Sequence, residues 1–596
     1  MKHTKHLDLL GFFPYSKYPK PTDNQVKALE AVEAANGKAI LEIPTGSGKT
    51  AVGYTYLRSC LEDAREITNG PVFYIVPNKT LIDEVKQQHP DVKVAYGRRE
   101  HQCLHYVDSG KNIPCSSLLP CPHRVDQETG ETKEDGVDPC PYYQNKYELK
   151  QGGIGCVTMA FYLYTMLFSK EFELPEGLVI DEAHQLARTV RNCLSYEISD
   201  WHLGKAIQLL NEFVPEQAAI LGNFLKTMIR IIKSRPSRQS SLLEAEELEQ
   251  LVAIIGKLNH RAIKEGVNQA IKSGLIDVLQ DSEVLEKLDI LVYDAGRYLH
   301  SFEYSLETSK RYALNYTYAY WREELVGKER KQYVLVIKSY YVAGLIKRIL
   351  SPNTLAMSAT IGDPQVLGFE TGIEGKFSTF PSDFPAKNAR IYMPTDTPNL
   401  AAKSRSRQDV TKTLRRVAKA CRRFNHNGIR CMMVVASNAQ RDKFVELCKE
   451  EFVNTITYGN GTPAREAVAR FKDGEGNVLV GTTANLGEGV DLPKGLAPVI
   501  FYFVPGWPNP KDPTTVFEER RFGSSRWRLW IWRVMIAIRQ VRGRNLRSRK
   551  DRGVTFFISQ QFRNLVYPAL PDWDKDSYRG EMKFDDAVED ALELLK

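Results

Sequence analysis

The sequence has few cysteines and lacks any long hydrophobic segment. Its ten cysteines are spread over 596 residues, which is too sparse for a scaffold held together by disulfides. No stretch reaches the roughly 18 uninterrupted apolar residues that a membrane-spanning helix needs. The first residues also lack the apolar segment of a secretory signal. These absences predict a protein without a membrane-embedded part that works in a reducing compartment.

A strong excess of one charge is also missing. The chain carries 81 basic and 73 acidic side chains, a formal net charge of +8, which permits a polyanionic partner without proving one. Hydrophobic residues make up 42% and charged residues 26%, ordinary values that exclude a disordered or collagen-like chain. Neither an internal repeat nor a long low-complexity tract is present. From the length of 596 residues we expect about three to five globular domains.

Short apolar runs of strand length alternate with helical patterns in two separate series. The runs of the first series are residues 38–43, 72–76, 177–180 and 354–357, and those of the second are residues 431–436, 477–481, 498–504 and 554–558. Strands that alternate with helices favour parallel sheets with right-handed crossovers. The sequence therefore predicts two α/β domains.

Two long segments interrupt the first series. Residues 95–150 are rich in Cys, Pro, Gly and His without sustained periodicity, and we interpret them as an irregular insert held by something other than a hydrophobic core. Residues 195–345 instead carry Leu, Ile and Val at three- and four-residue spacing, which predicts a helical module. The aromatic side chains near its end favour packing over base stacking, and they are Tyr312, Tyr316, Tyr318, Tyr320 and Trp321.

The strongest single motif is a phosphate-binding loop. Between an expected strand and an expected helix stand Pro44, Thr45, Gly46, Ser47, Gly48, Lys49 and Thr50. Backbone N–H groups of such a glycine-rich turn at a helix N-terminus bind anionic phosphates. The Lys49 ammonium can contact the β- and γ-phosphates, and the Thr50 hydroxyl can ligate Mg²⁺.

A second motif, Asp-Glu-Ala-His, ends the expected strand at 177–180. From this position Asp181 can hold Mg²⁺, and Glu182 can orient or deprotonate an attacking water. The same four residues alone would also suit an acidic helix cap. Their place at the end of a buried strand, downstream of the phosphate loop, favours the functional interpretation.

The third motif lies in an arginine-rich stretch, residues 520–552, and contains Gln540, Arg544 and Arg547. Arginines from a second domain stabilise charge on a transferred γ-phosphoryl group only when that domain is closed. Hydrolysis would therefore be coupled to domain motion. We expect a helix in this stretch to pack on the second domain, with its charges on the other face.

Four of the cysteines, Cys103, Cys115, Cys121 and Cys140, are clustered in the irregular insert. Thiolates can hold either an iron–sulfur cluster or zinc. The paired C-x-x-C knuckles of zinc ribbons are missing, but three nearby histidines keep zinc open, and unligated cysteines are a third possibility. These histidines are His101, His105 and His123.

Taken together and in order, these motifs make the sequence resemble the superfamily 2 helicases, and more narrowly the XPD/DinG-type iron–sulfur DNA helicases. The segments similar to the family's motifs are Gln25 and residues 43–50, 76–80, 181–184, 358–360, 434–438, 481–483, 487–493 and 540–553. The last segment fits the family pattern Q-x-x-G-R-x-x-R-x-x-x-D-x-G at every fixed position.

The resemblance implies an α/β fold with two RecA-like P-loop motor domains, in which the first carries an iron–sulfur cluster insert and a helical Arch insert. The implied divisions are residues 1–95, 151–194 and 346–375 for motor domain 1, residues 96–150 for the cluster insert, residues 195–345 for the Arch, and residues 376–596 for motor domain 2. Cys140 begins the Cys-Pro-Tyr-Tyr sequence that commonly closes the cluster segment in this family.

The resemblance also assigns roles to residues. The implied catalytic residues are Lys49, Glu182, Arg544 and Arg547. The implied nucleotide contacts are Gln25, residues 44–50, Asp181, Glu182, Asp491, Gln540, Arg544 and Arg547. ATP, Mg²⁺ on Thr50 and Asp181, and a 4Fe–4S cluster on Cys103, Cys115, Cys121 and Cys140 are the implied cofactors. Thr482, Asp491 and Lys79 would face the nucleic-acid strand.

The implied activity is that of an ATP-hydrolysing DNA helicase or translocase that moves 5′→3′ on single-stranded or tailed duplex DNA. Branched DNA and proteins of repair or defence complexes are implied partners of a monomeric, cytoplasmic protein, nucleoid-associated if the source is prokaryotic. Two alternatives stay open: an ATP-gated accessory subunit of a repair or defence complex with weak unwinding, and an unwinder of RNA or DNA–RNA hybrids.

Overall fold

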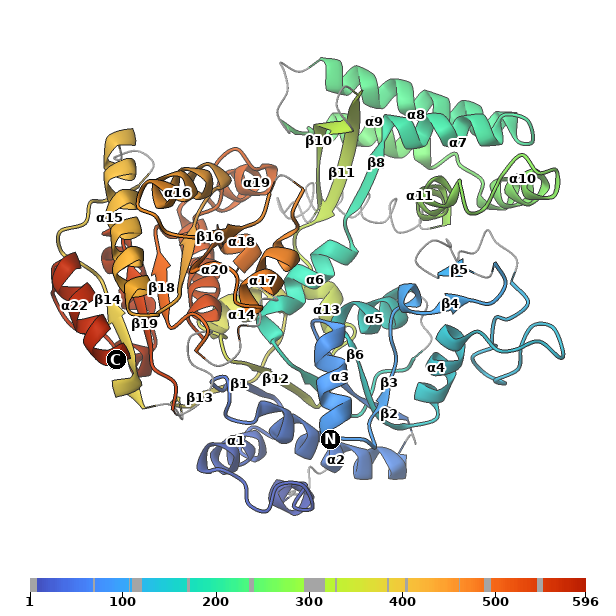
Figure 1. Ribbon diagram of the computed structural model, residues 1–596. Helices are drawn as coiled ribbons and strands as arrows, with labels where there is room; N and C mark the ends of the chain where they lie inside the picture. Colours follow the sequence, from blue (N-terminus) through green and yellow to red (C-terminus); the bar gives the residue numbers. More distant parts are fainter. Residues whose placement is uncertain are drawn as a thin grey trace.

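Two α/β lobes and a mixed module make up the computed structural model (Figure 1). The residues that it describes are 8–67, 70–106, 108–109, 121–168, 172–234, 241–293, 317–326, 330–382, 385–401, 406–459, 461–486, 492, 495–543 and 550–596.

The first lobe is built on a parallel sheet with the strand order β13-β1-β12-β7-β2-β6-β3. Its strands are β1 (Ala39–Glu42), β2 (Pro71–Val76), β3 (Lys93–Val94), β6 (Gly153–Thr158), β7 (Leu178–Ile180), β12 (Thr354–Ser358) and β13 (Lys376–Thr379). The inner strands are apolar and buried, as expected where helices cover both faces. Because β13 pairs with β1, this sheet continues past residue 375.

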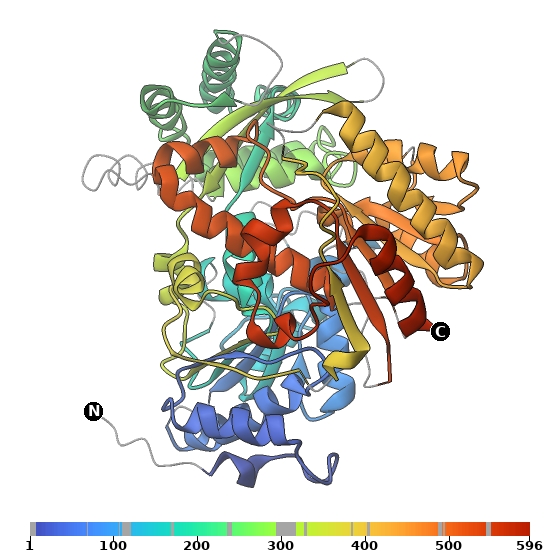
Figure 2. The same cartoon turned by 90° about the vertical axis from the view of Figure 1, so that its left-hand side faces the viewer.

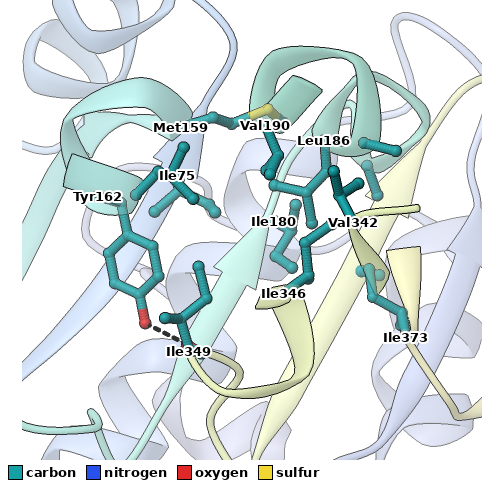
Figure 3. Close-up of a cluster of buried hydrophobic side chains, with 14 of the residues drawn as sticks. Ile75, Met159, Tyr162, Ile180, Leu186, Val190, Val342, Ile346, Ile349 and Ile373 are labelled. Carbon is teal, nitrogen blue, oxygen red and sulfur yellow. Dashed lines mark hydrogen bonds between the residues drawn. The ribbon is translucent and has the colours of Figure 1, made fainter. Parts of the chain in front are cut away.

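Helices and two hydrophobic cores, one on each face of the sheet, complete the first lobe. The helices are α1 (Asp23–Glu33), α2 (Lys49–Ile67), α3 (Lys79–Gln88), α4 (Pro141–Lys150), α5 (Met159–Leu163), α6 (Leu186–Cys193), α13 (Ala343–Lys347) and α14 (Pro364–Thr371). Figure 3 shows Val190 and Ile180 packed against Val342 and Ile346 in one of these cores. This core therefore joins chain segments on either side of the long insertion.

The second lobe contains a parallel sheet with the order β14-β19-β18-β15-β17-β16. Its strands are β14 (Ala389–Tyr392), β15 (Cys431–Val435), β16 (Thr455–Thr457), β17 (Val478–Thr482), β18 (Val499–Tyr502) and β19 (Gly553–Phe557). Its helices are α15 (Arg407–His426), α16 (Asn438–Glu450), α17 (Ala464–Lys472), α18 (Thr483–Leu486), α19 (Pro513–Phe522), α20 (Arg526–Arg542), α21 (Asp572–Lys575) and α22 (Phe584–Leu595). The two predicted α/β domains with parallel sheets are confirmed.

The module between α6 and α13 is not purely helical, and the sequence interpretation was wrong on this point. Its helices are α7 (Asp200–Leu210), α8 (Pro215–Lys233), α9 (Ala245–Ile255), α10 (His260–Lys272) and α11 (Ser282–Tyr293). They pack with an antiparallel sheet of order β8-β11-β10-β9, formed by β8 (Tyr196–Ser199), β9 (Ser241–Leu242), β10 (Thr317–Val326) and β11 (Arg330–Ser339). The β-branched and aromatic side chains of β10 and β11 suit a half-buried strand better than a helix.

The aromatic end of this module supports packing rather than base stacking for the residues that can be assessed. Tyr320 and Trp321 are 7% and 2% exposed. Trp321 belongs to the hydrophobic core that the helices of the module share. Tyr312 and Tyr316 lie outside the described residues, as does the side chain of Tyr318.

Among its described residues, the cysteine-rich insert has little regular structure apart from α4. It contains the short pair β4 (Gln102–Cys103) and β5 (Asp108–Ser109). Arg99 reaches Glu286 of α11 at 2.9 Å, so the insert touches the module above it (Figure 1). In the part of the chain that the structure describes, no helix is long and apolar enough to cross a bilayer.

Helix α20 packs on both lobes, which corrects the expectation that its charged face points away from the second lobe. Leu529 and Trp532 join a core of the first lobe, whereas Val534 and Ile538 join a core of the second. Arg539 is buried between the lobes at 7% exposure. Periodicity alone cannot identify two apolar faces that serve two different domains. The view in Figure 2 shows the red segments that contain α20 above the blue first lobe.

Candidate nucleotide site and nucleic-acid groove

The phosphate loop joins β1 to α2 in the predicted place. Gly46 and Gly48 adopt φ values of 84° and 75°, left-handed conformations that favour glycine. The Gln25 side chain donates to the Gly48 carbonyl at 3.3 Å and closes a capping box with Thr22 at the start of α1. The Ser47 hydroxyl is buried and has no hydrogen-bond partner among the described residues, as expected for a loop whose donors serve a bound anion.

The carboxylates at the end of β7 lie beside this loop. The Lys49 ammonium is 3.5 Å from Oε1 of Glu182. Tyr74 donates to Asp181 at 3.2 Å, and the Thr50 side chain hydrogen-bonds the same tyrosine. The structure therefore brings Lys49, Thr50, Asp181 and Glu182 together, as the motifs predict.

The pKa values of the two carboxylates are shifted in opposite directions. Burial raises the pKa of Asp181 to about 6, an effect that Lys49 opposes and the neighbouring Glu182 charge reinforces. Burial would also raise the pKa of Glu182, but Lys49 and His184 lower it below its ordinary value. Glu182 is thus held as an anion, the form that can accept a proton from water.

Glu182 is also connected to the segment that follows β12. The Ser358 hydroxyl donates to Oε2 of Glu182 at 2.8 Å, and Nδ1 of His184 lies 2.8 Å from the same hydroxyl. Glu182 has a left-handed backbone with φ of 51°, a strained conformation for a residue with a side chain. These contacts fix the carboxylate at the mouth of the cleft.

A cavity of about 360 Å³ lies between the two lobes at this point. The first lobe contributes Pro44, Thr45 and Glu182, and the second contributes Gln540 and Arg542. Sequence reasoning missed Arg542, which occupies a variable position of its motif. The signal that could have identified it was its own positive charge, two positions before Arg544 in the same segment.

Several predicted site residues fall where no description is possible. Asp491, Arg544 and Arg547 lie outside the described residues. Gly543, next to Arg544 in the chain, lines the cavity together with Thr45. The motif that carries both arginines therefore begins at the nucleotide cleft.

A second cavity, of about 820 Å³, lies between the lobes on the other side of Gln540, which lines both cavities. Its wall combines basic side chains with small polar ones. The basic residues are Arg188, Arg191, Lys338 and Arg533, and the polar or aromatic ones include Asn438, Thr482, Thr483, Asn485 and Trp507. Basic and aromatic groups are what single-stranded nucleic acid requires. Thr482 lines this cavity, whereas Lys79 pairs with Glu100 at 2.7 Å.

The described cysteines of the insert share a third, small cavity. Cys103, Cys121 and Cys140 line about 30 Å³ of space with His101, His105 and His123. Cys115 lies outside the described residues. Among the described residues no three His, Cys, Asp or Glu side chains converge closely enough to bind a metal ion, although the thiol and imidazole donors are of the kind that iron–sulfur clusters and zinc take.

Comparisons with known proteins agree with this geometry. The model of the family described as "Helicase C-terminal domain" matches residues 421–575, and that of "Type III restriction enzyme, res subunit" matches residues 18–209. No protein of curated function matches the sequence.

Three solved structures share the fold over most of the chain. An XPD helicase aligns with a TM-score of 0.59 at 18% identity, covering 94% of this chain and 98% of that one. An apo XPD aligns at 0.54 and 16% identity, with coverages of 94% and 100%, and Xpd4 of S. tokodaii at 0.53 and 13% identity, with coverages of 92% and 97%. The second lobe therefore contains a helicase C-terminal domain, the chain has the fold of the XPD structures, and it is an ATP-hydrolysing helicase enzyme.

Proposed function

We propose that this enzyme is a DNA helicase or translocase that moves 5′→3′ on single-stranded or tailed duplex DNA and couples ATP hydrolysis to strand separation. The observation that carries the proposal is that Gln540 lines both interlobe cavities. One side chain thus borders the nucleotide cleft and the basic groove. A change at the bound nucleotide can reach the groove through a single helix end.

The nucleotide chemistry follows from the residues at the cleft. ATP enters as its Mg²⁺ complex, which Thr50 and Asp181 would hold, while Lys49 contacts the outer phosphates. Glu182, an anion in contact with Lys49 and Ser358, accepts the proton of the attacking water. Arg544 and Arg547 stabilise the charge that develops on the γ-phosphoryl group when the lobes close.

The groove between the lobes is the proposed strand-binding site. Arg188 and Lys338 contact backbone phosphates, which gives affinity without sequence preference, whereas Arg191 and Arg533 are paired with Glu370 and Glu518. Trp507, in edge contact with Trp527 at 5.7 Å between ring centroids, offers a face on which a base can stack. A strand held by both lobes moves when the lobes move.

The cysteine-rich insert, residues 96–150, is proposed to hold a 4Fe–4S cluster through Cys103, Cys115, Cys121 and Cys140. Such a cluster would crosslink a segment that has few buried apolar side chains. Residues 195–345 form the proposed Arch of this monomeric enzyme. Its proposed first motor domain is residues 1–95, 151–194 and 346–379, extended past 375 to include β13, and its second is residues 380–596. A cytoplasmic location, nucleoid-associated if the source is prokaryotic, and partners from repair or defence complexes complete the proposal.

The test compares purified wild type with Lys49→Ala on duplexes with a 5′ or a 3′ single-stranded tail. Wild type should unwind the 5′-tailed DNA and hydrolyse ATP, and Lys49→Ala should do neither while still binding single strands. Lys347→Ala, which removes an exposed lysine paired with Glu374 in the same lobe, is the matched control and should behave as wild type.

Each other outcome would contradict a stated part of the proposal. Full hydrolysis by Lys49→Ala would contradict the assigned site. Preference for the 3′ tail would contradict the polarity, and faster unwinding of DNA–RNA hybrids would contradict the DNA substrate. Hydrolysis without unwinding of any tailed duplex would favour an ATP-gated accessory subunit.

A further inference from the structure

Helix α20 lies along the segment that follows β12 and leads directly into the arginine motif of the second lobe. Arg528 contacts Asp363 at 2.6 Å, and Nε1 of Trp532 donates to the Ile361 carbonyl at 2.7 Å. One helix of the second lobe therefore follows the first lobe's Ser-Ala-Thr segment over several residues and ends at the nucleotide cleft.

The innermost contact of this helix is a forked, buried ion pair. The two terminal nitrogens of Arg539 each donate to one carboxylate oxygen of Glu42 at 3.0 Å. The side chains are only 5% and 3% exposed. Nη2 of Arg539 also donates to the Ala359 carbonyl at 3.0 Å, and the Gly362 amide donates to Glu42 at 2.7 Å. Glu42 thus ties together three segments.

The positions of these two residues in the chain make the pair informative. Glu42 is the last residue of β1, immediately before the phosphate loop. Arg539 immediately precedes Gln540, which donates to Thr360 at 3.1 Å and lines both cavities. The pair therefore joins the residue that precedes the phosphate loop to the residue that precedes the arginine motif, across the boundary between the lobes.

Arg539 also contacts an acidic residue of the second lobe, Asp574. Asp574 lies 3.6 Å from Nε of Arg539 and pairs with Arg542, which lines the nucleotide cavity. The charges alternate in sign along Glu42, Arg539, Asp574 and Arg542. Because all four are nearly buried, each depends on its neighbour for compensation.

We propose that Arg539 is a positioning residue for ATP hydrolysis, whose forked pair with Glu42 sets the arginine motif of the second lobe in register with the phosphate loop. This inference rests on the proposed nucleotide site. A planar guanidinium satisfies both carboxylate oxygens at once, which fixes orientation as well as distance. A lysine keeps the charge but loses the fork.

The pair acts on hydrolysis more than on nucleotide binding. The groups that hold ATP in the ground state, the loop amides and Lys49, belong to the first lobe and remain in place when the pair is lost. The arginine motif contributes to the transition state, so a misplaced motif lowers kcat with little change in KM.

The experiment measures steady-state ATP hydrolysis, ATP affinity and thermal unfolding for Arg539→Lys and Glu42→Gln. Each variant should lose roughly ten- to a hundredfold in kcat, the scale of a small misplacement, with ATP affinity near that of wild type. The double variant should be no worse than the poorer single one, because both remove the same contact. Arg528→Lys, on the same helix and facing the same segment but largely exposed, is the matched control and should keep full kcat.

Two results would overturn the inference. The first is a wild-type kcat in folded Arg539→Lys and Glu42→Gln, which would leave the pair a purely structural contact. The second is a loss of ATP affinity equal to the loss of kcat, which would mean that the pair serves ground-state binding. Lys49→Ala separates this question from the proposed function, since hydrolysis retained there would refute the site itself whatever Arg539 does.

Discussion

The nucleotide cleft and the cysteine-rich insert hold their functional side chains in different ways. In the cleft, Lys49, Glu182 and Ser358 are fixed by one another through short contacts. In the insert, the described residues from 96 to 150 include only Val125, Tyr143 and Leu149 as buried hydrophobic side chains. The side chains of the cleft are therefore held by contacts within the first lobe, whereas the insert needs support from outside its own core.

This difference distinguishes a bound group that is a substrate, as in the cleft, from one that would support the local structure, as in the insert. In the cleft, the carboxylates are positioned by contacts with other protein groups. The three described cysteines of the insert share one small cavity without converging on a common point. A metal centre would do there what hydrophobic burial does in the lobes.

The largest expected effect breaks the chemistry of the cleft and leaves its architecture intact. Glu182→Gln should lower kcat for ATP about a thousandfold, within the range for loss of a general base, while ATP affinity and the unfolding temperature stay close to those of wild type. Stopped assays of phosphate release measure kcat, and a fluorescent-nucleotide titration measures ATP affinity. An unchanged kcat would show that another group activates the water.

The next effect concerns the buried charges where the lobes meet beside the groove. Arg191 donates to both oxygens of Glu370 at 2.6 and 2.8 Å. Nη2 of Arg533 lies 3.7 Å from Oε2 of the same carboxylate. Glu370→Gln removes the charged partner of Arg191, whereas Arg533 keeps Glu518 at 2.6 Å, and should cost about 3 kcal/mol of unfolding free energy at neutral pH. Thermal unfolding of the two proteins side by side measures this loss.

The pH dependence of that loss has a defined sign. Burial would raise the pKa of Glu370, but Arg191 and Arg533 lower it below its ordinary value of 4.5. A lowered pKa in the folded state contributes stability above pH 4.5 that disappears as pH falls through the folded-state value. The gap between wild type and Glu370→Gln should therefore narrow under acid conditions, and a gap that widens there would contradict the assignment.

A smaller effect is expected in the groove, which the two lobes build together with β11 of the mixed module. Lys338→Ala should weaken binding of single-stranded DNA severalfold and reduce the salt dependence of the binding constant by about 0.7 in slope, the contribution of one phosphate contact on a single strand. Titrations at several salt concentrations measure both quantities. An unaltered slope would place the strand away from Lys338.

The smallest effect on hydrolysis is expected from the insert. Cys140→Ser should abolish bound iron or zinc but leave ATP hydrolysis without nucleic acid within about twofold of wild type, because distant sites act independently. Metal analysis, a visible spectrum and hydrolysis rates test this, with Cys193→Ser in α6 as a control that keeps the metal. Loss of hydrolysis in a folded Cys140→Ser protein would erase the contrast between the two regions.

The part of the site that sequence could predict is the part encoded locally. The phosphate loop and the Asp-Glu-Ala-His segment each follow a buried strand, so their residue types and spacing sufficed to place Lys49, Asp181 and Glu182 together. The parallel strands were also predictable, since their apolar runs are short and separated by helices. What was predicted in this way depends on neighbours within a few positions.

The remaining features depend on partners far apart in the chain. Glu42 and Arg539 are separated by 497 positions, and neither has an unusual local context. The strands β10 and β11 were missed because the surrounding helical periodicity dominated the pattern. The two-faced packing of α20 was missed because a helix that serves two cores looks, in one dimension, like an amphipathic helix with irregular charges.

The order of strands in the first sheet has a consequence for synthesis on the ribosome. Strand β1, which leads into the phosphate loop, is flanked by β12 and β13, and both are translated only after the insert and the mixed module. At ordinary elongation rates, its edges wait on the order of tens of seconds for their partners. A nascent chain in that interval exposes apolar strand edges, so we expect its yield in cells to depend on chaperones and on the pace of translation.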